Sequence, residues 1–245
     1  MKIFIIGYGK MGKMIESLAV NAGYEVVAIV DAGQFWPRFT ELDKPDVAIE
    51  FTQPDAVVDN IKHCVEWKIP IVTGTTGWEK YRDEVRSFCL QKEGAVMFGS
   101  NYSIGVNIWF NVIKAAASGF NKAKGYEVSI DETHHVNKKD KPSGTAITAA
   151  NLILESMQDY SGWSLNEEEN KIHITAHRKQ DITGTHSVLF SSEMDEIEFT
   201  HKAKNREGFA KGALRAAEWL CDKNGFFDFS QVFEEIFSIN NKKGN

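Results

Sequence analysis

The residues between positions 131 and 145 are the ones whose types and spacing could do chemistry. Two adjacent histidines, His134 and His135, are followed by a lysine-rich stretch that includes Lys138, and the segment ends in a helix start at Ser143. The N–H groups and hydroxyls of such a helix start suit a carboxylate ligand, and a nearby ammonium strengthens the anion site. The segment therefore predicts a site for a small dicarboxylate.

Paired histidines also raise the alternative of a metal site. Neighbouring residues at a strand end point to opposite faces, so His134 and His135 would not bind one ion together. The chain has no H-E-x-x-H spacing, and its three cysteines, Cys64, Cys89 and Cys221, form no CxxC pair. We therefore predict neither a metal site nor a disulfide framework. The lysine run taken alone is typical of a solvated loop.

A second group of residues could hold a dinucleotide. The strand-like run Lys2–Ile6 is followed by a G-x-G-x-x-G turn that opens a helix, made of Gly7, Tyr8, Gly9, Lys10, Met11 and Gly12. The glycines allow a tight turn, a close approach of the backbone to a pyrophosphate, and close packing of helix on strand. Free N–H groups at the helix start would face the phosphates.

Asp31 strengthens this interpretation and bears on the choice of cofactor. It stands nineteen residues after Gly12, at the end of the candidate strand Glu25–Val30. A carboxylate there can accept hydrogen bonds from both ribose hydroxyls of NAD. It would repel the 2′-phosphate of NADP, and Ala32 and Gly33 supply no guanidinium to offset it. We therefore expect NADH as cofactor, with weaker use of NADPH; the alternative is a structural turn with a strand-capping Asp.

Two further turns follow candidate strands at Ile69–Thr73 and Ala95–Phe98. Their small and hydroxyl-bearing residues could approach a nicotinamide ribose and bond its carboxamide, because ligands gather at the carboxyl ends of parallel strands. Ordinary turn chemistry is the alternative. The candidate cofactor contacts in these turns are Gly74, Thr75, Thr76, Ser100, Asn101 and Tyr102.

The elements that must position these residues follow two patterns of predicted strands and helices. The first hundred residues alternate β-rich runs with amphipathic helical patterns, which predicts βαβ units around a Rossmann-like parallel sheet. A further strand is expected at 46–51, and helices at 10–21, 54–66 and 78–92. Later, helical patterns at 106–117 and 145–157 accompany β-like runs at 126–133, 171–178, 183–190 and 196–202. This second pattern predicts an α+β domain with a mixed sheet. A final helix at 207–221 is expected to return to the first domain.

The predicted organisation is a dinucleotide-binding domain at 1–103, a substrate-binding and oligomerisation domain at 104–206, and a return to the first domain at 207–245. The net charge of −6 and the scattered basic residues argue against a nucleic-acid partner. No apolar run is long enough to span a bilayer and no signal peptide is recognisable, so we expect no membrane partner and a cytoplasmic location.

The segment from His134 to Thr145 resembles the signature of the dihydrodipicolinate reductase family. That signature is a histidine pair, a lysine and an Asp-x-Pro-Ser-Gly-Thr run, and here it reads H-H-V-N-K-K-D-K-P-S-G-T. Four more motifs are similar to family motifs and stand in the same order, at Glu50–Pro54, Gly74–Gly77, Asn101–Asn107 and Thr200–Ala213. The resemblance covers most of the chain.

The resemblance implies an activity and roles for individual residues. The activity is NAD(P)H-dependent reduction of 4-hydroxy-tetrahydrodipicolinate to tetrahydrodipicolinate, with loss of water, in lysine and diaminopimelate biosynthesis. By position, His134 matches the family's proposed proton donor and Lys138 its second catalytic cation, while His135, Gly144 and Thr145 match contacts to a substrate carboxylate. An imidazole titrates near neutral pH, so either His134 or Lys138 could deliver the proton. The family also implies a homotetramer built through the second sheet.

The chain departs from the family pattern in two segments. Asp31–Glu41 is shorter than usual and lacks the arginine that often follows the acid, which favours NADH. Arg178–His186 keeps its arginine, glycine and final histidine but has glutamine and threonine where the family usually has glycine and glutamate. This second departure bears on assembly into a tetramer.

Two other functions could use the same front half of the chain. A sugar-type dehydrogenase with the same front half would carry a Glu-Lys-Pro triplet after its fourth strand, where this chain has Thr73–Gly77. A redox-sensing NAD-binding module would need a partner-binding segment, such as a basic helix-turn-helix, and would have no use for His134 and Lys138 beside an anion site.

Overall fold

The computed structural model describes residues 1–136, 138 and 140–238. The chain divides into two compact units. The first contains Met1–Ser103 and the chain from Glu207 onward, and the second contains Ile104–Arg206. None of the helices in these described parts is both long and apolar enough to cross a membrane.

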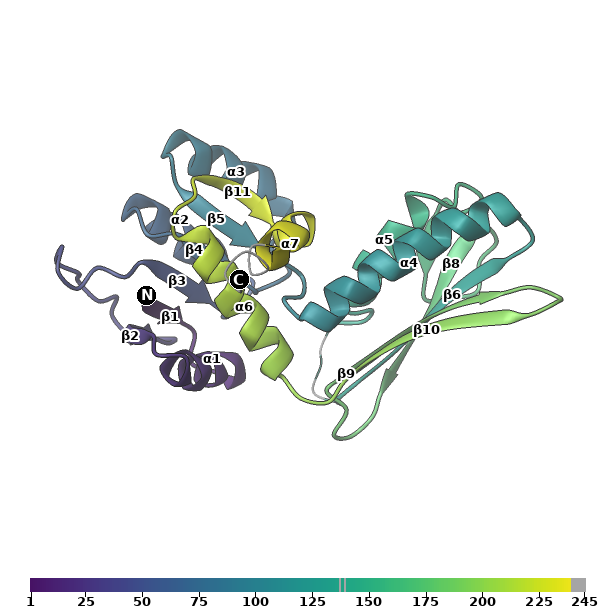
Figure 1. Cartoon of the computed structure of the whole chain (residues 1–245), viewed down its shortest axis with the longest axis horizontal. Coiled ribbons are helices and arrows are strands. Elements are labelled where there is room, and N and C mark those ends of the chain that lie inside the picture. The colour runs from purple at the N-terminus through teal and green to yellow at the C-terminus, as the bar shows by residue number, and fades with distance from the viewer. Residues whose placement is uncertain (137, 139, 239–245) are drawn as a thin grey trace, which may run out of the picture. The chain divides into compact units, whose positions relative to one another are not determined.

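The first unit is built on a six-stranded parallel sheet (Figure 1). In spatial order its strands are β11 (Gly225–Asp228), β5 (Ala95–Phe98), β4 (Ile71–Thr73), β3 (Val47–Glu50), β1 (Lys2–Ile6) and β2 (Glu25–Val30). All of β3 and most of β1 are buried, as expected for central strands covered on both faces. The strand order reverses between β1 and β3, and the carboxyl ends at such a point form the usual ligand crevice.

Helices cover both faces of this sheet (Figure 1). On one face α1 (Lys10–Asn21) packs against α6 (Glu207–Leu220), and on the other α2 (Val57–Glu66) packs against α3 (Arg82–Gln91). The short 3-10 helix η1 (Glu79–Tyr81) precedes α3, and α7 (Phe229–Ser238) follows β11.

The second unit is a five-stranded mixed sheet with two helices on one face (Figure 1). In spatial order its strands are β10 (Glu196–Ala203), β9 (Gly184–Ser191), β6 (Glu127–His134), β8 (Lys171–Arg178) and β7 (Gly162–Ser164). The central strand β6 pairs antiparallel with β9 and parallel with β8. Its register sets Glu132 opposite His186 and His134 opposite Arg178.

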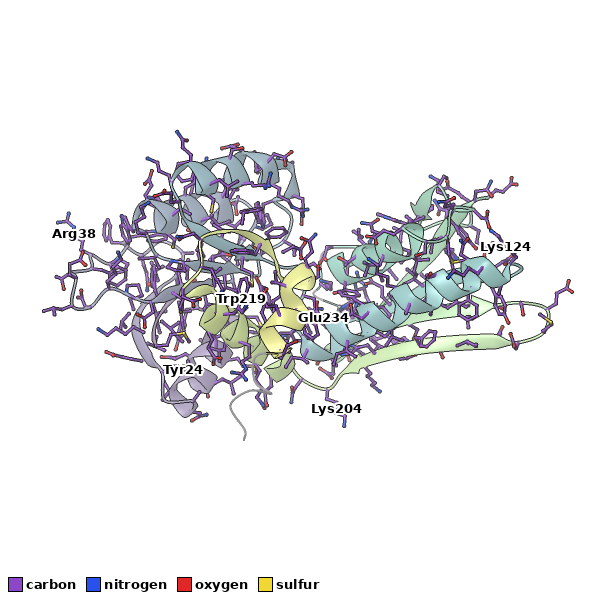
Figure 2. The ribbon with its side chains drawn as sticks, turned by 45° about the horizontal axis from the view of Figure 1, so that its top comes forward. Tyr24, Arg38, Lys124, Lys204, Trp219 and Glu234 are labelled. Atoms are coloured by element: carbon purple, nitrogen blue, oxygen red, sulfur yellow. The ribbon has the colours of Figure 1, made fainter. Side chains whose placement is uncertain are left out.

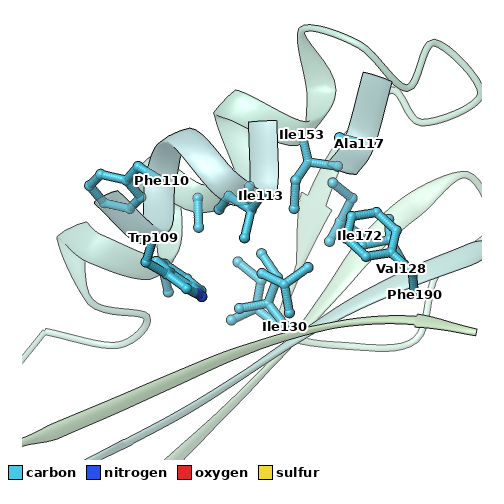
Figure 3. Packing of buried hydrophobic residues seen from close by; sticks show 14 of the residues in the cluster. Trp109, Phe110, Ile113, Ala117, Val128, Ile130, Ile153, Ile172 and Phe190 are labelled. Atoms are coloured by element: carbon cyan, nitrogen blue, oxygen red, sulfur yellow. The ribbon is translucent and has the colours of Figure 1, made fainter. Parts of the chain in front are cut away.

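The core of the second unit lies between the sheet and the helices α4 (Ile104–Ala123) and α5 (Gly144–Leu154). Figure 3 shows Ile113 of α4 above Ile130 and Phe190 of the sheet. Burying one such side chain contributes roughly 1.5–3 kcal/mol. This packing holds β6 with alternate residues facing the helices, so that Glu132 and His134 are both on its buried face.

The predicted fold class is confirmed. Five elements have the predicted bounds, namely β1, α1, β2, β5 and β8. The helix expected at 106–117 extends over Ile104–Ala123, because Phe120 packs into the core. The helix expected at 54–66 begins only at Val57. The pattern does not predict β7, β11 or α7, and β11 is a four-residue strand that depends on its pairing with β5.

Gly212 marks the closest approach of α6 to the segment that follows β5. A Cβ at this position would lie 1.7 Å from the carbonyl oxygen of Tyr102. We expect Gly212→Ala to lower the free energy of unfolding by about 2 kcal/mol or more, because the helix must move away from backbone atoms. Urea unfolding followed by circular dichroism measures the change.

Gly208→Ala on the same helix is the matched control. The nearest atom to a Cβ there is the Ser103 hydroxyl oxygen at 3.5 Å, an ordinary contact, and alanine favours the helix. Equal losses in the two variants would contradict this account of how α6 packs.

Candidate active site

The carboxylate of Glu132 lies at the centre of a polar cluster in the second unit. Its side chain is fully buried. The backbone N–H of Ser143 donates to both of its oxygens at 3.1 Å, and the guanidinium of Arg178 donates to Oε1 at 3.3 Å. A buried carboxylate of this kind is stable only when a charge and hydrogen bonds compensate it.

Two histidines complete the cluster. His134 lies two residues after Glu132 on β6, and its Nδ1 is 3.4 Å from Glu132 Oε2. His186 of β9 places its Nε2 3.3 Å from the Ser143 hydroxyl. The two rings meet edge to face with centroids 4.9 Å apart.

Burial keeps both imidazoles neutral. Burial first, and then the charges of Lys138 and Arg178, lower the pKa of His134 from 6.5 to about 4. Burial first, and then His134, lower the pKa of His186 to about 3. The expectation that the His134 imidazole titrates near neutral pH is therefore wrong for this state, because desolvation opposes its charged form.

Lys138 lies in the loop between β6 and α5. Its ammonium is 2.9 Å from a carboxylate oxygen of Asp140, and a quarter of its side chain is exposed. Arg178 donates hydrogen bonds to the backbone carbonyls of Lys138, at 3.4 Å, and of Asp140. Asn137 and Lys139 of this loop lie outside the described residues.

The predicted helix start is present. Ser143 is the N-cap of α5, and its hydroxyl accepts a hydrogen bond from the N–H of Ala146 at 3.2 Å. Gly144 and Thr145 form the first turn, where the dipole end of the helix is positive. His135 follows the last residue of β6 and is half-buried, whereas His134 is buried. The fold therefore separates the histidine pair.

Glu132, His134 and His186 also lie close enough to share a metal ion, with ligand atoms within 4.8 Å of one another. The sequence argument against a metal rested on the opposed faces of the adjacent histidines and on the lack of metal-binding spacings, whereas this grouping arises from the pairing of β6 with β9. Arg178 already neutralises Glu132, and a divalent cation would face that guanidinium. The absence of a metal stays our prediction.

In the first unit, the glycine turn after β1 has two positions closed by packing and one that is open. A Cβ on Gly7, whose φ is +92°, would lie 2.2 Å from the carbonyl oxygen of Phe51, and one on Gly12 would lie 2.1 Å from the carbonyl oxygen of Gly7. A Cβ on Gly9 would meet no atom within 4 Å. Gly9 leaves free space beside the N-terminus of α1, where a phosphate could approach the backbone.

The other predicted residues of this turn line its outer side. Lys10 is exposed and Met11 is half-buried. The hydroxyl of Tyr8 donates to Glu16, which raises the pKa of Tyr8, and the ammonium of Lys13 lies 5.5 Å from the centre of its ring. Asp31 directly follows β2 and is exposed. Its backbone N–H donates a hydrogen bond to the side-chain oxygen of Gln34 at 2.9 Å.

Two hydroxyls in the turns after β4 and β5, those of Thr75 and Tyr102, are buried and hydrogen-bonded. Thr75 is buried; its hydroxyl donates to Glu50 at 3.0 Å and accepts from the N–H of Thr52 at 2.8 Å. The buried hydroxyl of Tyr102 donates to the carbonyl of Thr73 at 2.9 Å. Because both hydroxyls are already hydrogen-bonded within the unit, Thr75 would contact a ligand through its backbone, and Tyr102 through its backbone or its ring. In the turn after β4, Gly74 lies directly against the ring of Phe51 and Thr76 is half-buried. In the turn after β5, Ser100 is exposed, and the Asn101 side chain accepts a hydrogen bond from the N–H of Ser103 at 2.9 Å.

Glu50 is the residue that connects these turns. Its fully buried carboxylate, at the carboxyl end of β3, accepts hydrogen bonds from Thr52, Thr73, Thr75 and Asn60. Burial raises its pKa, although these hydrogen bonds oppose the rise. The sequence places Glu50 in a family-like motif but indicates no site role for it, nor for Glu132, Arg178 or His186. An acid inside an otherwise apolar strand was the available signal for Glu50.

These features define a class of protein: a parallel-sheet, dinucleotide-binding fold of the oxidoreductase type, with a second α+β unit that carries a polar site. The family models described as dihydrodipicolinate reductase, N-terminus and dihydrodipicolinate reductase, C-terminus match residues 1–102 and 105–233. The chain belongs to the dihydrodipicolinate reductase family.

Individual relatives agree with this assignment. The 4-hydroxy-tetrahydrodipicolinate reductase of Christiangramia forsetii is 41% identical over 238 residues, which cover 97% of this chain and 99% of that protein. The enzyme of the same name from Neisseria meningitidis serogroup A is 33% identical over 241 residues, 93% of this chain and 85% of its own. The predicted family and enzyme class are confirmed: the chain is an oxidoreductase of lysine and diaminopimelate biosynthesis.

A solved structure shares the fold. The dipicolinate-bound dihydrodipicolinate reductase from Paenisporosarcina sp. TG-14 has a TM-score of 0.74 at 23% identity, covering 94% of this chain and 98% of its own. At this level of identity the likeness shows the fold alone.

The two buried histidines predict a loss of stability in acid. Both rings bind a proton more readily in the unfolded chain, where the pKa is near 6.5, than in the fold, where it is about 4 for His134 and about 3 for His186. Their contribution to stability is complete above about pH 6.5 and is lost as the pH falls through this window. The free energy of unfolding of the wild type should fall between pH 6.5 and pH 4. In His186→Gln we expect this fall to be smaller by about 3 kcal/mol.

Urea unfolding at a series of pH values measures this difference. His63→Gln, at an exposed histidine of the first unit, is the control and should keep the wild-type pH dependence. An unchanged pH dependence in His186→Gln would show that this ring is not held neutral by the fold.

Proposed function

We propose that this chain reduces 4-hydroxy-tetrahydrodipicolinate with NAD(P)H, with loss of water, at the cluster between β6 and α5. One observation carries the proposal: the buried ring of His134 and the N-terminus of α5 adjoin the buried carboxylate of Glu132, and Arg178, which pairs with Glu132, also bonds the backbone of Lys138. The cluster combines a proton source, a polar ring and an anion site. These are the groups that reduction of a cyclic dicarboxylate requires.

The N-terminus of α5 is the proposed substrate-carboxylate site. The first helical residues, Gly144 and Thr145, follow the N-cap Ser143 and bring the positive end of the helix dipole. His135 and Lys138 precede it in sequence. The ligand class is carried over from the dipicolinate of the Paenisporosarcina reductase, which is also a small cyclic dicarboxylate.

Lys138 is the proposed proton donor. Burial lowers the pKa of His134 to about 4, so its ring is neutral in most molecules at pH 7. A lysine ammonium is a compact charge with three donors and can serve both to hold a carboxylate and to deliver a proton. His134 then acts as a neutral ring beside the substrate, hydrogen-bonding without carrying charge.

The cofactor supplies a hydride from its nicotinamide when bound. The open space at Gly9 and the N-terminus of α1 fit a pyrophosphate, and the exposed carboxylate of Asp31 fits the ribose hydroxyls of the adenosine half. The proposed contacts on the nicotinamide side are the backbone of the turns that Glu50 holds.

NADH is the proposed preferred cofactor. Asp31 would repel a 2′-phosphate, and the nearest arginine in sequence points elsewhere. Arg38 lines a surface pocket with Trp67 and Ile69, which precede β4, whereas Asp31 follows β2. In a parallel sheet these are opposite ends, and Figure 2 places Arg38 at the periphery of its unit.

We also propose that the chain forms a homotetramer through the second unit. The helices α4 and α5 cover only one face of its sheet (Figure 1). The other face carries half-exposed side chains at alternate positions of β8 and β9.

The proposed activity is tested by following NADH absorbance with substrate made in place by the preceding synthase. We expect rapid oxidation by the wild type, slower oxidation of NADPH, and a loss of about 100-fold or more in kcat for Lys138→Ala, since a proton donor contributes on this scale. Lys122→Ala, at an exposed lysine of α4, should match the wild type. No oxidation of either cofactor by a protein that still binds NADH would overturn the proposal.

Gly9 offers a test of the dinucleotide site that does not depend on the substrate. We expect Gly9→Ala to fold normally, since a Cβ there meets no protein atom, and to weaken NADH binding at least tenfold by blocking the pyrophosphate. Fluorescence titration with NADH measures the affinity. Gly119→Ala in α4, which also has open space around its Cβ, is the control. Equal affinities in the two variants would exclude the turn as the phosphate site.

A further inference from the structure

Glu132 and Arg178 form a buried pair that has no role in the proposed chemistry, yet the pair contacts several parts of the polar cluster. The donors to Glu132 come from α5, which carries Gly144 and Thr145, and from β8, which pairs with the strand of His134. Ser143 begins α5, and Arg178 ends β8 opposite His134. The pair therefore stands between the proton-donor loop and the anion site.

Arg178 holds the loop of Lys138 by its backbone. Its Nε donates to the carbonyl of Lys138 at 3.4 Å, its Nη2 to the carbonyl of Asp140, and its Nη1 to the carbonyl of His177 at 2.7 Å. A guanidinium can make these bonds and pair with Glu132 together, because its donors form a rigid planar fork. A lysine could not.

Glu132 faces His134 from the other side. The Nδ1 atom of His134 is buried and makes no hydrogen bond within the described residues, yet it lies 3.4 Å from Glu132 Oε2. A small turn of the ring would close this contact into a hydrogen bond. A carboxylate at this distance favours the tautomer with the proton on Nδ1, which leaves Nε2 as the acceptor.

The space around Nε2 supports this orientation. A Cβ at Gly184 of β9 would lie 3.2 Å from His134 Nε2, closer than nearly all real contacts. Glycine at this position avoids a close contact with the Nε2 edge of the ring, while Nδ1 is buried beside Glu132.

We propose that Glu132 is a positioning residue of the reaction. Through Arg178 it fixes the backbone that carries Lys138, through Ser143 it fixes the anion site, and through Nδ1 it sets the tautomer of His134. The inference rests on the proposed function, and none of these roles requires Glu132 to touch the substrate.

A purely structural ion pair would predict something different. Buried pairs are often neutral or unfavourable for stability compared with apolar residues of similar size, so stability alone is a weak reason to keep one. If Glu132 serves only the fold, replacing it should change stability and leave the turnover of the folded protein and the tautomer of His134 unaltered.

The test is Glu132→Gln, which keeps the size of the side chain but removes its charge and presents an amide N–H to Arg178. We expect kcat to fall at least tenfold, while the Kd for NADH, which the other unit binds in our proposal, stays within twofold. Glu127→Gln, at the exposed start of the same strand, is the control and should keep the wild-type kcat. A wild-type kcat in folded Glu132→Gln would overturn the inference.

A second measurement does not depend on the folding of Glu132→Gln. Nitrogen-15 NMR of the histidine side chains in the wild-type protein, with His134→Gln used only to assign its signal, reports the tautomer directly. We expect the proton on Nδ1, and a ring protonated on Nε2 instead would also overturn the inference. A wild type that oxidises neither cofactor would count against the proposed function, whereas an active wild type with an equally active Glu132→Gln counts against the role of Glu132 alone.

Discussion

The carboxylate of Glu132 is taken fully out of water, and its charge must be compensated within the protein. Arg178 supplies the opposite charge, and the N-terminus of α5 supplies a backbone N–H. These compensating groups come from two separate segments, and Arg178 also bonds the loop of Lys138. Satisfying one buried charge therefore brings β8, α5 and that loop together at the end of β6. The candidate site is a consequence of that requirement.

The first unit uses a buried glutamate in a chemically different way. Glu50 is compensated by hydroxyl and amide donors rather than by a cation, and burial accordingly raises its pKa. It hydrogen-bonds to the turns that follow neighbouring strands, and the Thr75 hydroxyl takes part in these bonds. In both units, an acid near the carboxyl end of a central strand holds loops in place that would otherwise be free to vary.

Burial also divides the chemical work among the polar residues. Desolvation leaves His134 and His186 neutral at physiological pH. Lys138 has a partly exposed side chain, and we propose it as the proton donor. The choice between His134 and Lys138, open at the level of sequence, thus turns on the depth of each side chain below the surface.

Much of this protein was determined by sequence alone, because the signals are local. Strand and helix periodicity gave the fold class and five elements with their bounds, and contiguous motifs identified the family, the glycine turn and the segment from His134 to Thr145. Only the tertiary structure decided what depends on register and burial. Pairing of β6 with β8 and β9 brought Arg178 and His186 to Glu132, and enclosure in the core set the histidine pKa values. Residues forty or more positions apart meet through packing, which no local pattern records.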